Sequence, residues 1–291
     1  MRIGIVILPE QRWASARHRW RQAEEFGFDH AWTYDHLGWR DLVDGPWFDA
    51  IATLTAAATV TERIKLGTFV ASPNFRHPVH LAREALAVDD VSDGRLLLGV
   101  GAGGTGFDAE VLGQAPLTPR ERVDRFTEFV ELIGRLTAED HVSYAGEHYR
   151  AVDARTLPGP VQQPRPPLIV AANGPRALKV AAKYGDGWVT TGAQAQDSEQ
   201  AWWQSVREAS DRFGAALERS GRAPVARYLN LDSSPVYSLS SVGAFEDAVG
   251  RAAELGFTDV MTHWPRAMSW YAGDEKVLEK VAELLPRLRE C

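Results

Sequence analysis

Short apolar runs alternate with longer amphipathic stretches along the whole chain. The run over 3–8 is continuously apolar, which is typical of a strand buried on both faces, and the segment 11–26 after it has helical spacing. The same alternation continues through both halves of the sequence. It predicts strands at 3–8, 29–34, 64–71, 95–100, 167–172, 187–191, 225–231 and 258–263, with helices at 11–26, 49–60, 78–91, 174–184, 197–219, 241–254 and 274–289, and a further helix beginning after Thr118.

Two of these helices carry specific signals. Thr118 and Glu121 have the spacing of a capping box, with Pro119 at the first helical position. The last helix shows apolar residues at intervals of four, three and four, at Val277, Val281, Leu284 and Leu288. Both segments are therefore expected to pack one face against a core.

Eight strand–helix units over 291 residues predict a closed parallel barrel, the (β/α)8 TIM barrel of the α/β class. No linker divides the chain, so one domain over 1–291 is expected. Two stretches depart from the rhythm, at about 101–117 and 138–166, and the second contains a predicted hairpin near "HVSYAGEHYRAV". Insertions of this kind lie where such barrels place specificity.

Composition and charge narrow the function classes. Apolar residues make up 45% of the chain and charged residues 24%, which are ordinary globular values, and the net charge of −7 argues against a nucleic-acid surface. The single cysteine, Cys291, cannot form an internal disulfide. No apolar stretch reaches the roughly 18 residues of a membrane span, and the chain opens directly in a strand, so the cytoplasm is the expected location.

The glycine-rich segment "GVGAGG" at 99–104 matches a dinucleotide-binding fingerprint in its letters. That fingerprint needs a helix starting at the third glycine and an acidic residue ending a second strand about 20 residues later. Here no helix is predicted before Thr118, and the acids at that distance, Glu121 and Asp124, lie inside the helix. Two interpretations stay open: the glycines allow the backbone to approach a flat ligand at a barrel mouth, or they form a loop that binds no ligand.

Polar residues follow two other strands. Asp35 and His36 come after the second strand; His36 could exchange a proton, although a helix cap and a surface histidine would look the same. Gly174 begins a helix after the fifth strand, where free backbone amides suit a phosphate, and Arg176 lies beside it. An ordinary helix start accounts for this second pattern equally well.

Three stretches together resemble the bacterial luciferase-like monooxygenase superfamily, which includes flavin enzymes and their deazaflavin (F420) relatives. They are "TYDHL", "LGTFVASPNFRHPVHLAREALAVDDVSDGRLLLGVGAGG" and "PPLIVAANGPRALKVAAKYGDGWVTTG". The resemblance covers nearly the whole chain and is most specific over 66–104. It implies a barrel with a flavin-type ring in its mouth and a small organic substrate.

The resemblance also implies roles for individual residues. His36 would be the proton donor or acceptor beside the reactive centre, and Asp35 would assist it and contact the cofactor. Phe69 and Val70 occupy the position of a non-proline cis peptide that many members carry behind the ring. The other implied cofactor contacts are Gly101, Gly103, Gly104, Ala172, Asn173, Gly174 and Arg176.

Two chemistries fit this family. With FMN the reaction would be a monooxygenation fed by a separate flavin reductase; with F420 it would be hydride transfer to or from the substrate. The Asp35–His36 pair favours the deazaflavin branch. The sugar-phosphate dehydrogenases of that branch carry a catalytic acid after the fourth strand, whereas this chain has no carboxylate there before Asp108, which argues against a sugar phosphate.

The remaining expectations concern substrate, partners and other classes. Trp39 and Trp264, with Trp47, predict an apolar, aromatic entrance for the substrate. Many relatives are dimers, which predicts a homodimer. A non-catalytic member of the family stays possible, and a metal hydrolase built on His77 and His80 is disfavoured because no carboxylate cluster accompanies them, so no metal is expected.

Overall fold

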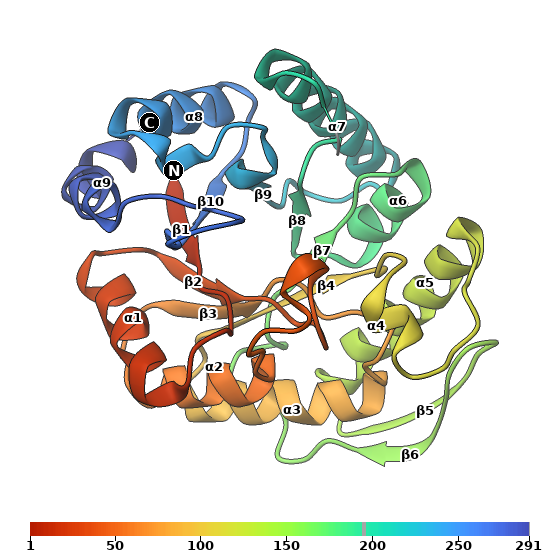
Figure 1. Cartoon of the computed structure of the whole chain (residues 1–291). Helices are drawn as coiled ribbons and strands as arrows, with labels where there is room; N and C mark the ends of the chain where they lie inside the picture. Colours follow the sequence, from red (N-terminus) through yellow and green to blue (C-terminus); the bar gives the residue numbers. More distant parts are fainter. Residues whose placement is uncertain (194–195, 291) are drawn as a thin grey trace.

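Eight parallel strands close into a barrel in the computed structural model, which describes residues 1–193 and 196–290. The strand order around the barrel is β1-β10-β9-β8-β7-β4-β3-β2, and helices surround it (Figure 1). This confirms the predicted (β/α)8 fold. The barrel strands are β1 (Arg2–Val6), β2 (His30–Thr33), β3 (Lys65–Thr68), β4 (Leu96–Gly101), β7 (Leu168–Ala171), β8 (Gly187–Thr190), β9 (Ala226–Asn230) and β10 (Asp259–His263).

The helices lie where the amphipathic pattern predicts them. The Thr118 side chain accepts from the Glu121 amide and the Glu121 carboxylate accepts from the Thr118 amide, so the predicted capping box is present. No helix within 1–193 or 196–290 is long and apolar enough to cross a membrane. The helices between strands are α1 (Trp13–Glu25), α2 (Ala50–Ala58), α3 (Pro78–Val91), α5 (Pro119–Leu136), α6 (Pro175–Tyr184), α7 (Glu199–Arg219), α8 (Val242–Glu254) and α9 (Glu275–Leu288), with short 3-10 turns η1 (Arg40–Leu42), η2 (Leu231–Ser233) and η3 (Ser238–Ser240).

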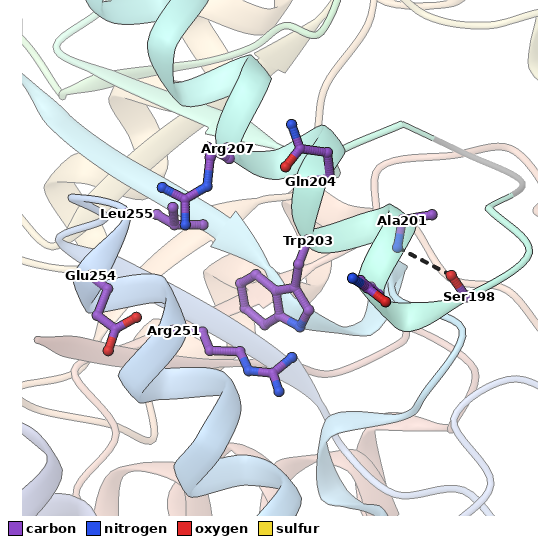
Figure 2. Close-up of a pocket in the computed structure, with 9 residues that line it drawn as sticks. Ser198, Ala201, Trp203, Gln204, Arg207, Arg251, Glu254 and Leu255 are labelled. Carbon is purple, nitrogen blue, oxygen red and sulfur yellow. Dashed lines mark hydrogen bonds between the residues drawn. The ribbon is translucent and has the colours of Figure 1, made fainter.

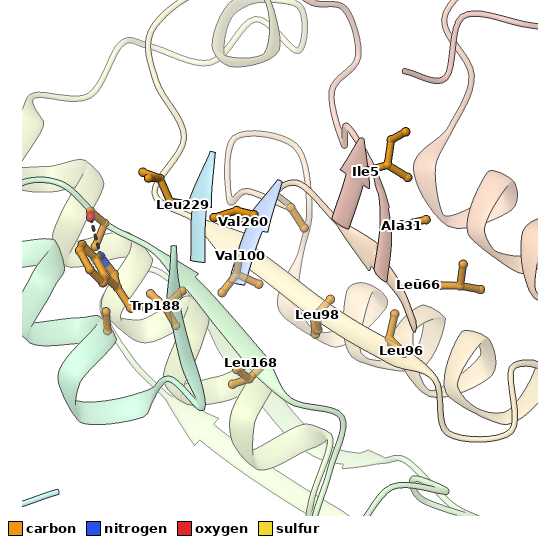
Figure 3. Packing of buried hydrophobic residues seen from close by; sticks show 14 of the residues in the cluster. Ile5, Ala31, Leu66, Leu96, Leu98, Val100, Leu168, Trp188, Leu229 and Val260 are labelled. Atoms are coloured by element: carbon orange, nitrogen blue, oxygen red, sulfur yellow. Dashed lines mark hydrogen bonds between the residues drawn. The ribbon is translucent and has the colours of Figure 1, made fainter. Parts of the chain in front are cut away.

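Side-chain alternation divides each strand between two cores. β1 pairs with β10 from Arg2↔Asp259 to Val6↔His263, which closes the ring. One set of strand side chains belongs to the outer core between the barrel and the helices; Figure 3 shows Ile5, Leu98 and Val260 of this set, each fully buried. Burying a side chain of this size contributes about 1.5–3 kcal/mol. The inward set forms a second cluster of Val6, Trp32, Leu97, Ile169, Val189, Tyr228 and Met261.

A polar network seals the amino-terminal end of the barrel. Arg2 donates to both oxygens of Asp259, at 2.7 and 2.6 Å, and His30 Nε2 lies 3.1 Å from the same carboxylate. Trp32 Nε1 donates to His30 Nδ1 at 2.7 Å, so the imidazole proton is on Nε2 and faces the carboxylate. This end is therefore filled by the chain itself, and a ligand must enter from the opposite end.

Both predicted insertions are present. Residues 138–166 carry the predicted hairpin as an antiparallel pair, β5 (His141–Ala145) and β6 (Arg150–Arg155), outside the barrel. The prediction that no helix begins before Thr118 was wrong, because the first insertion contains α4 (Phe107–Glu110). The third strand is shorter than predicted: β3 ends at Thr68, and beyond it Ala71 makes an isolated bridge to Val100.

Candidate active site

Four strands deliver the predicted site segments to one end of the barrel. In a parallel barrel the carboxyl ends of the strands meet at a single mouth. Residues 34–36 follow β2, residues 69–70 follow β3, Gly101 ends β4 and residues 172–174 follow β7. Because these four strands are consecutive neighbours in the ring, the topology gathers the segments along one arc of the mouth.

A carboxylate from the first insertion holds His36. The Nδ1 atom of His36 is hydrogen-bonded to the carboxylate of Asp108 in α4, and the other Asp108 oxygen accepts from the Leu37 amide at 2.7 Å. A carboxylate only accepts hydrogen bonds, so Nδ1 carries a proton, and in the neutral form of the ring Nε2 is left as an acceptor. The imidazole is 29% exposed, so it is open to a small molecule at the mouth.

Asp108 is the partner of His36 in the structure, whereas the sequence indicated it only as the first carboxylate after the fourth strand. Its side chain is buried, and α4 places it 72 residues along the chain from His36. The available signal was an acidic residue in the loop after the fourth strand. Its pairing with His36 was hidden because α4 has only four residues and lies among glycines.

Asp35 has a protein partner that the sequence did not predict. Arg76 donates to both of its oxygens, at 2.6 and 3.0 Å, and also reaches Asp49 at 2.7 Å. Burial raises the pKa of Asp35, although Arg76 acts in the opposite direction. Asp35 is 1% exposed, so it holds Arg76 and the turn after β2 and is closed to solvent.

The segment after β3 packs directly on the glycine-rich end of β4. The Phe69–Val70 peptide is cis, at the position that the resemblance indicates. A Cβ atom on Gly101 would lie 2.7 Å from Val70 Cγ2, and one on Gly103 would lie 2.6 Å from the Asn74 side chain. These two glycines are thus required by the chain's own packing. Gly104 differs, because a Cβ atom there would meet nothing within 4 Å.

The start of α6 is exposed and has no side-chain cap. Gly174 is its N-cap residue with open space around it, and residues 173–176 are all exposed. Asn173 accepts from Thr190 Oγ1 at 2.6 Å and donates to Thr191 Oγ1 at 2.8 Å, which fixes the turn. Ala172 is buried below it, and the Arg176 guanidinium is paired with Asp124.

Aromatic side chains surround Tyr34 at the mouth. Trp39 lies edge-on to Tyr34, with ring centroids 5.1 Å apart, and stacks over Tyr271 at 6.2 Å. The Arg40 guanidinium lies over the rings of both Trp39 and Trp270, at 4.6 and 4.0 Å. This η1 segment thereby contacts the loop before α9.

Trp264 does not line the substrate entrance, where the sequence predicted it. Its ring stacks on Phe26 at the end of α1, and its Nε1 donates to Glu275 at 2.9 Å. The side chain is 3% exposed and belongs to the outer, helix-facing core. Its indole is therefore a packing group, and we leave Trp264 out of the proposed substrate site.

A second histidine is buried under the mouth. His263, at the end of β10, has Nδ1 2.8 Å from Asp232 Oδ2 and Nε2 2.9 Å from the Tyr34 hydroxyl, which in turn lies 2.9 Å from the Tyr271 hydroxyl. Burial lowers the pKa of His263, with Asp232 opposing it, and raises the pKa of Tyr271 to about 12. Tyr34 belongs to the "TYDHL" stretch, but no pattern in the sequence predicted its contacts with His263, Asp232 and Tyr271.

A cavity of about 520 Å³ lies outside the barrel, between α7 and α8. Figure 2 shows Trp203 as its floor, with Arg207 on α7 and Arg251 and Glu254 on α8 around it. None of the predicted site residues lines it.

At the start of α3, His77 Nδ1 accepts a hydrogen bond from the Val79 amide and so caps the helix. The described residues hold no group of three or more potential metal ligands from His, Cys, Asp and Glu.

Comparisons with known proteins agree on one family. The sequence model described as luciferase-like monooxygenase matches residues 1–231. An "F420-dependent glucose-6-phosphate dehydrogenase" of Kineococcus radiotolerans is 33% identical over 90% of this chain and 76% of its own length. The enzyme of the same name from Amycolatopsis mediterranei is 36% identical over 60% of this chain, and the match spans about half, 53%, of that relative.

Solved structures show the same fold. An "F420-dependent secondary alcohol dehydrogenase" superposes with a TM-score of 0.82 at 19% identity, covering 99% of both chains. A monooxygenase from Streptomyces bottropensis superposes with a TM-score of 0.76 at 22% identity, also covering 99% of both. With the barrel, the cis peptide and the family match together, the chain belongs to the luciferase-like monooxygenase family.

Proposed function

We propose that this protein is an F420-dependent oxidoreductase that transfers a hydride between the deazaflavin and a small organic substrate. The observation that carries the proposal is the His36–Asp108 pair at the barrel mouth, next to the segment that packs on β4. Curated relatives named as F420-dependent dehydrogenases, including a hydroxymycolic acid dehydrogenase of Mycobacterium tuberculosis at 31% identity, support the choice of cofactor.

The residues present fit a flavin-type ring with a phosphate. The open space at Gly104 and the exposed, uncapped start of α6 leave room and free amides. Beside Gly104 lies a small cavity of about 30 Å³, lined also by Arg122 and Arg125. Arg125 Nε is buried and has no hydrogen-bond partner among the described residues, which suits an anionic group at this place.

We assign Val70, Gly101, Gly103 and Gly104 to the ring side of this site, and Ala172, Asn173 and Gly174 to the phosphate side. Phe69 supports the ring from behind, and Asp35 acts through Arg76. Arg176 would have to break its ion pair with Asp124 to reach the phosphate, so we propose that it contributes little to phosphate binding. When bound, the deazaflavin supplies a carbon-centred hydride carrier with little reactivity toward oxygen.

His36 would hold and move the proton in this site. Asp108 keeps the proton on Nδ1, and Nε2 therefore accepts a proton from the mouth and returns it later. A neutral histidine oriented in this way can serve either direction of hydride transfer. A positioned group of this kind contributes about 10²–10⁴-fold to the rate.

The rim of the mouth favours an apolar substrate. Large apolar side chains are exposed on three loops that flank it, after β2, β4 and β10: Leu37, Phe48, Phe107, Val111, Leu112, Met268 and Trp270. Trp39 lies inside this rim, against Tyr34. The homodimer and the cytoplasmic location stay predictions, and the exposed rim is a surface that a second copy could also cover.

The test is a titration of the protein without cofactor, with F420 and with FMN separately, followed by ring fluorescence. We expect tight F420 binding, and His36→Ala should lower turnover by about 10²-fold or more while changing F420 affinity less than about threefold. Tight binding of FMN alone would favour the monooxygenase with a separate flavin reductase. Binding of neither would favour a non-catalytic protein.

A further inference from the structure

We infer that Tyr271, Tyr34, His263 and Asp232, here named the phenol relay, take the hydroxyl proton of an alcohol substrate into the barrel. The inference rests on the proposed function for the hydride acceptor. Its basis is a chain of three hydrogen bonds of 2.9, 2.9 and 2.8 Å that runs from the loop before α9 to the turn after β9.

Asp232 fixes one end of the phenol relay. Its Oδ2 accepts from the backbone amide of His263 at 2.6 Å and from Thr262 Oγ1 at 3.2 Å, and its Oδ1 accepts from the Ser238 amide at 2.9 Å. Every partner donates, as an ionised carboxylate requires. The third contact on Oδ2, His263 Nδ1, must therefore carry a hydrogen.

The direction of the remaining bonds follows from that tautomer. With the proton on Nδ1, Nε2 of the neutral, buried His263 can only accept, so the Tyr34 hydroxyl donates to it. Tyr34 has then used its one hydrogen, and the 2.9 Å contact with Tyr271 requires Tyr271 to donate. The only hydrogen of the Tyr271 hydroxyl is thus engaged with Tyr34, and its oxygen keeps free lone pairs, which makes it an acceptor for a hydroxyl group.

Position and exposure place the open end of the phenol relay at the mouth. His263 is fully buried and Tyr34 is 5% exposed, whereas Tyr271 is only half-buried. The Tyr271 ring stacks on His263, with centroids 3.7 Å apart, and lies nearly parallel to the Trp39 ring, with centroids 6.2 Å apart. Because Trp39 and Tyr271 are neighbours, we expect a substrate bound against Trp39 to lie near the Tyr271 oxygen.

The proton balance is simple in the direction of alcohol oxidation. The substrate O–H bond breaks and its proton joins the Tyr271 oxygen; Tyr271 passes its own proton to Tyr34, and Tyr34 passes its own to His263 Nε2. The electron pair of the adjacent C–H bond leaves with the hydride, which the oxidised deazaflavin of the proposed function accepts. The product is a carbonyl, and the imidazolium of His263 is paired with Asp232.

This assignment separates two proton sites. The rings of Tyr34 and His36 meet edge to face with centroids 5.7 Å apart. The only hydrogen of the Tyr34 hydroxyl is donated to His263, so Tyr34 has no hydrogen to donate to His36, and His36 keeps its own proton site at the mouth. Tyr271 is the residue that touches substrate, and Tyr34, His263 and Asp232 are positioning residues that act through it.

The test is nitrogen NMR of the full chain without cofactor, with its histidines labelled with ¹⁵N. Cyclohexanol is the probe ligand, and cyclohexanone is the comparison ligand of similar shape that has no hydroxyl hydrogen. In the wild type we expect His263 to show a protonated Nδ1 and a bare Nε2, and the Nε2 signal to move when cyclohexanol binds. Tyr271→Phe should weaken cyclohexanol binding about five- to tenfold, the effect of one hydrogen bond. Tyr34→Phe should leave binding in place but abolish the shift at His263.

Tyr237→Phe is the matched control, because its phenol donates to the backbone carbonyl of His263 at 2.7 Å and lies off the relay. It should change neither binding nor the cyclohexanol-induced shift. A protonated Nε2 in the wild type, equal binding of cyclohexanol and cyclohexanone, or an unchanged shift in Tyr34→Phe would each overturn the inference. Because no cofactor is present, failure of F420 to bind would count against the proposed function alone.

Discussion

Replacement of Asp108 separates the structural and chemical parts of the His36 site. Asp108 is 7% exposed and accepts hydrogen bonds from His36 Nδ1, from the Leu37 amide at 2.7 Å and from the Gly38 amide at 3.4 Å. Asp108→Ala leaves the two amides without an acceptor in a closed site. A buried amide that loses its acceptor costs about 1–3 kcal/mol, and the longer bond from Gly38 should contribute the smaller share. We therefore expect a loss of about 3 kcal/mol in the free energy of unfolding.

Asp108→Asn keeps an oxygen for the Leu37 amide, so it should cost only about 1 kcal/mol. Its amide nitrogen would donate to Nδ1, however, and this would move the histidine proton to Nε2. We therefore expect hydride transfer to slow by about 10²–10⁴-fold while folding is nearly unchanged.

Urea unfolding and the rate of hydride transfer measure the two effects, and Glu110→Gln, an exposed carboxylate in the same short helix, is the control for charge alone. Asp108→Asn with the wild-type rate, or Asp108→Ala within about 0.5 kcal/mol of wild type, would refute this reasoning.

Three further predictions follow from the packing and electrostatics. Gly99→Ala should destabilise the protein by about 3 kcal/mol, because its Cβ atom would lie 2.0 Å from the Thr68 carbonyl oxygen, whereas Gly104→Ala should stay within about 0.5 kcal/mol; thermal unfolding compares them. Burial raises the pKa of Asp259, but bonds from His30, Arg2 and Thr258 outweigh it and the pKa is lowered, so its contribution is complete above the unfolded value and is lost as pH falls through the folded one. Stability should therefore drop as pH falls below about 5. Asp259→Asn should be less stable at neutral pH but should show a flatter drop in urea titrations at several pH values, and an equally steep drop in the variant would contradict this role of Asp259. Trp270→Ala should raise KM for apolar substrates about five- to tenfold by removing the ring that covers Arg40 and Trp39, and an unchanged KM would exclude Trp270 from the entrance.

The sequence predicted the barrel because short, mostly buried runs with apolar residues alternate with helical stretches. Runs such as 3–8 and 95–100 are recognisable by composition alone, and their order fixes which strand ends share the mouth. It also led to His36, which follows shortly after a strand, while the cis peptide at Phe69–Val70 was expected only from the family resemblance. Local pattern was sufficient wherever neighbours in sequence are neighbours in space.

The contact partners of the site residues could not be predicted from local sequence pattern. Tyr34 and His263 are 229 residues apart and meet only because β1 pairs with both β2 and β10. Asp35 and Arg76, 41 residues apart, meet across neighbouring strands. The glycines of 99–104 show a second limit: their letters alone do not reveal that Gly101 and Gly103 also make room for Val70 and Asn74, whereas Gly104 has open space beside it.

A crystal structure of the protein with F420 bound tests the central claim most directly. We predict one deazaflavin whose ring lies against Val70 and Gly104, within reach of His36 Nε2, and whose phosphate meets the amides at the start of α6. A coenzyme bound in the cavity between α7 and α8, or a ring at the mouth that touches neither His36 nor the segment after β3, would contradict the account.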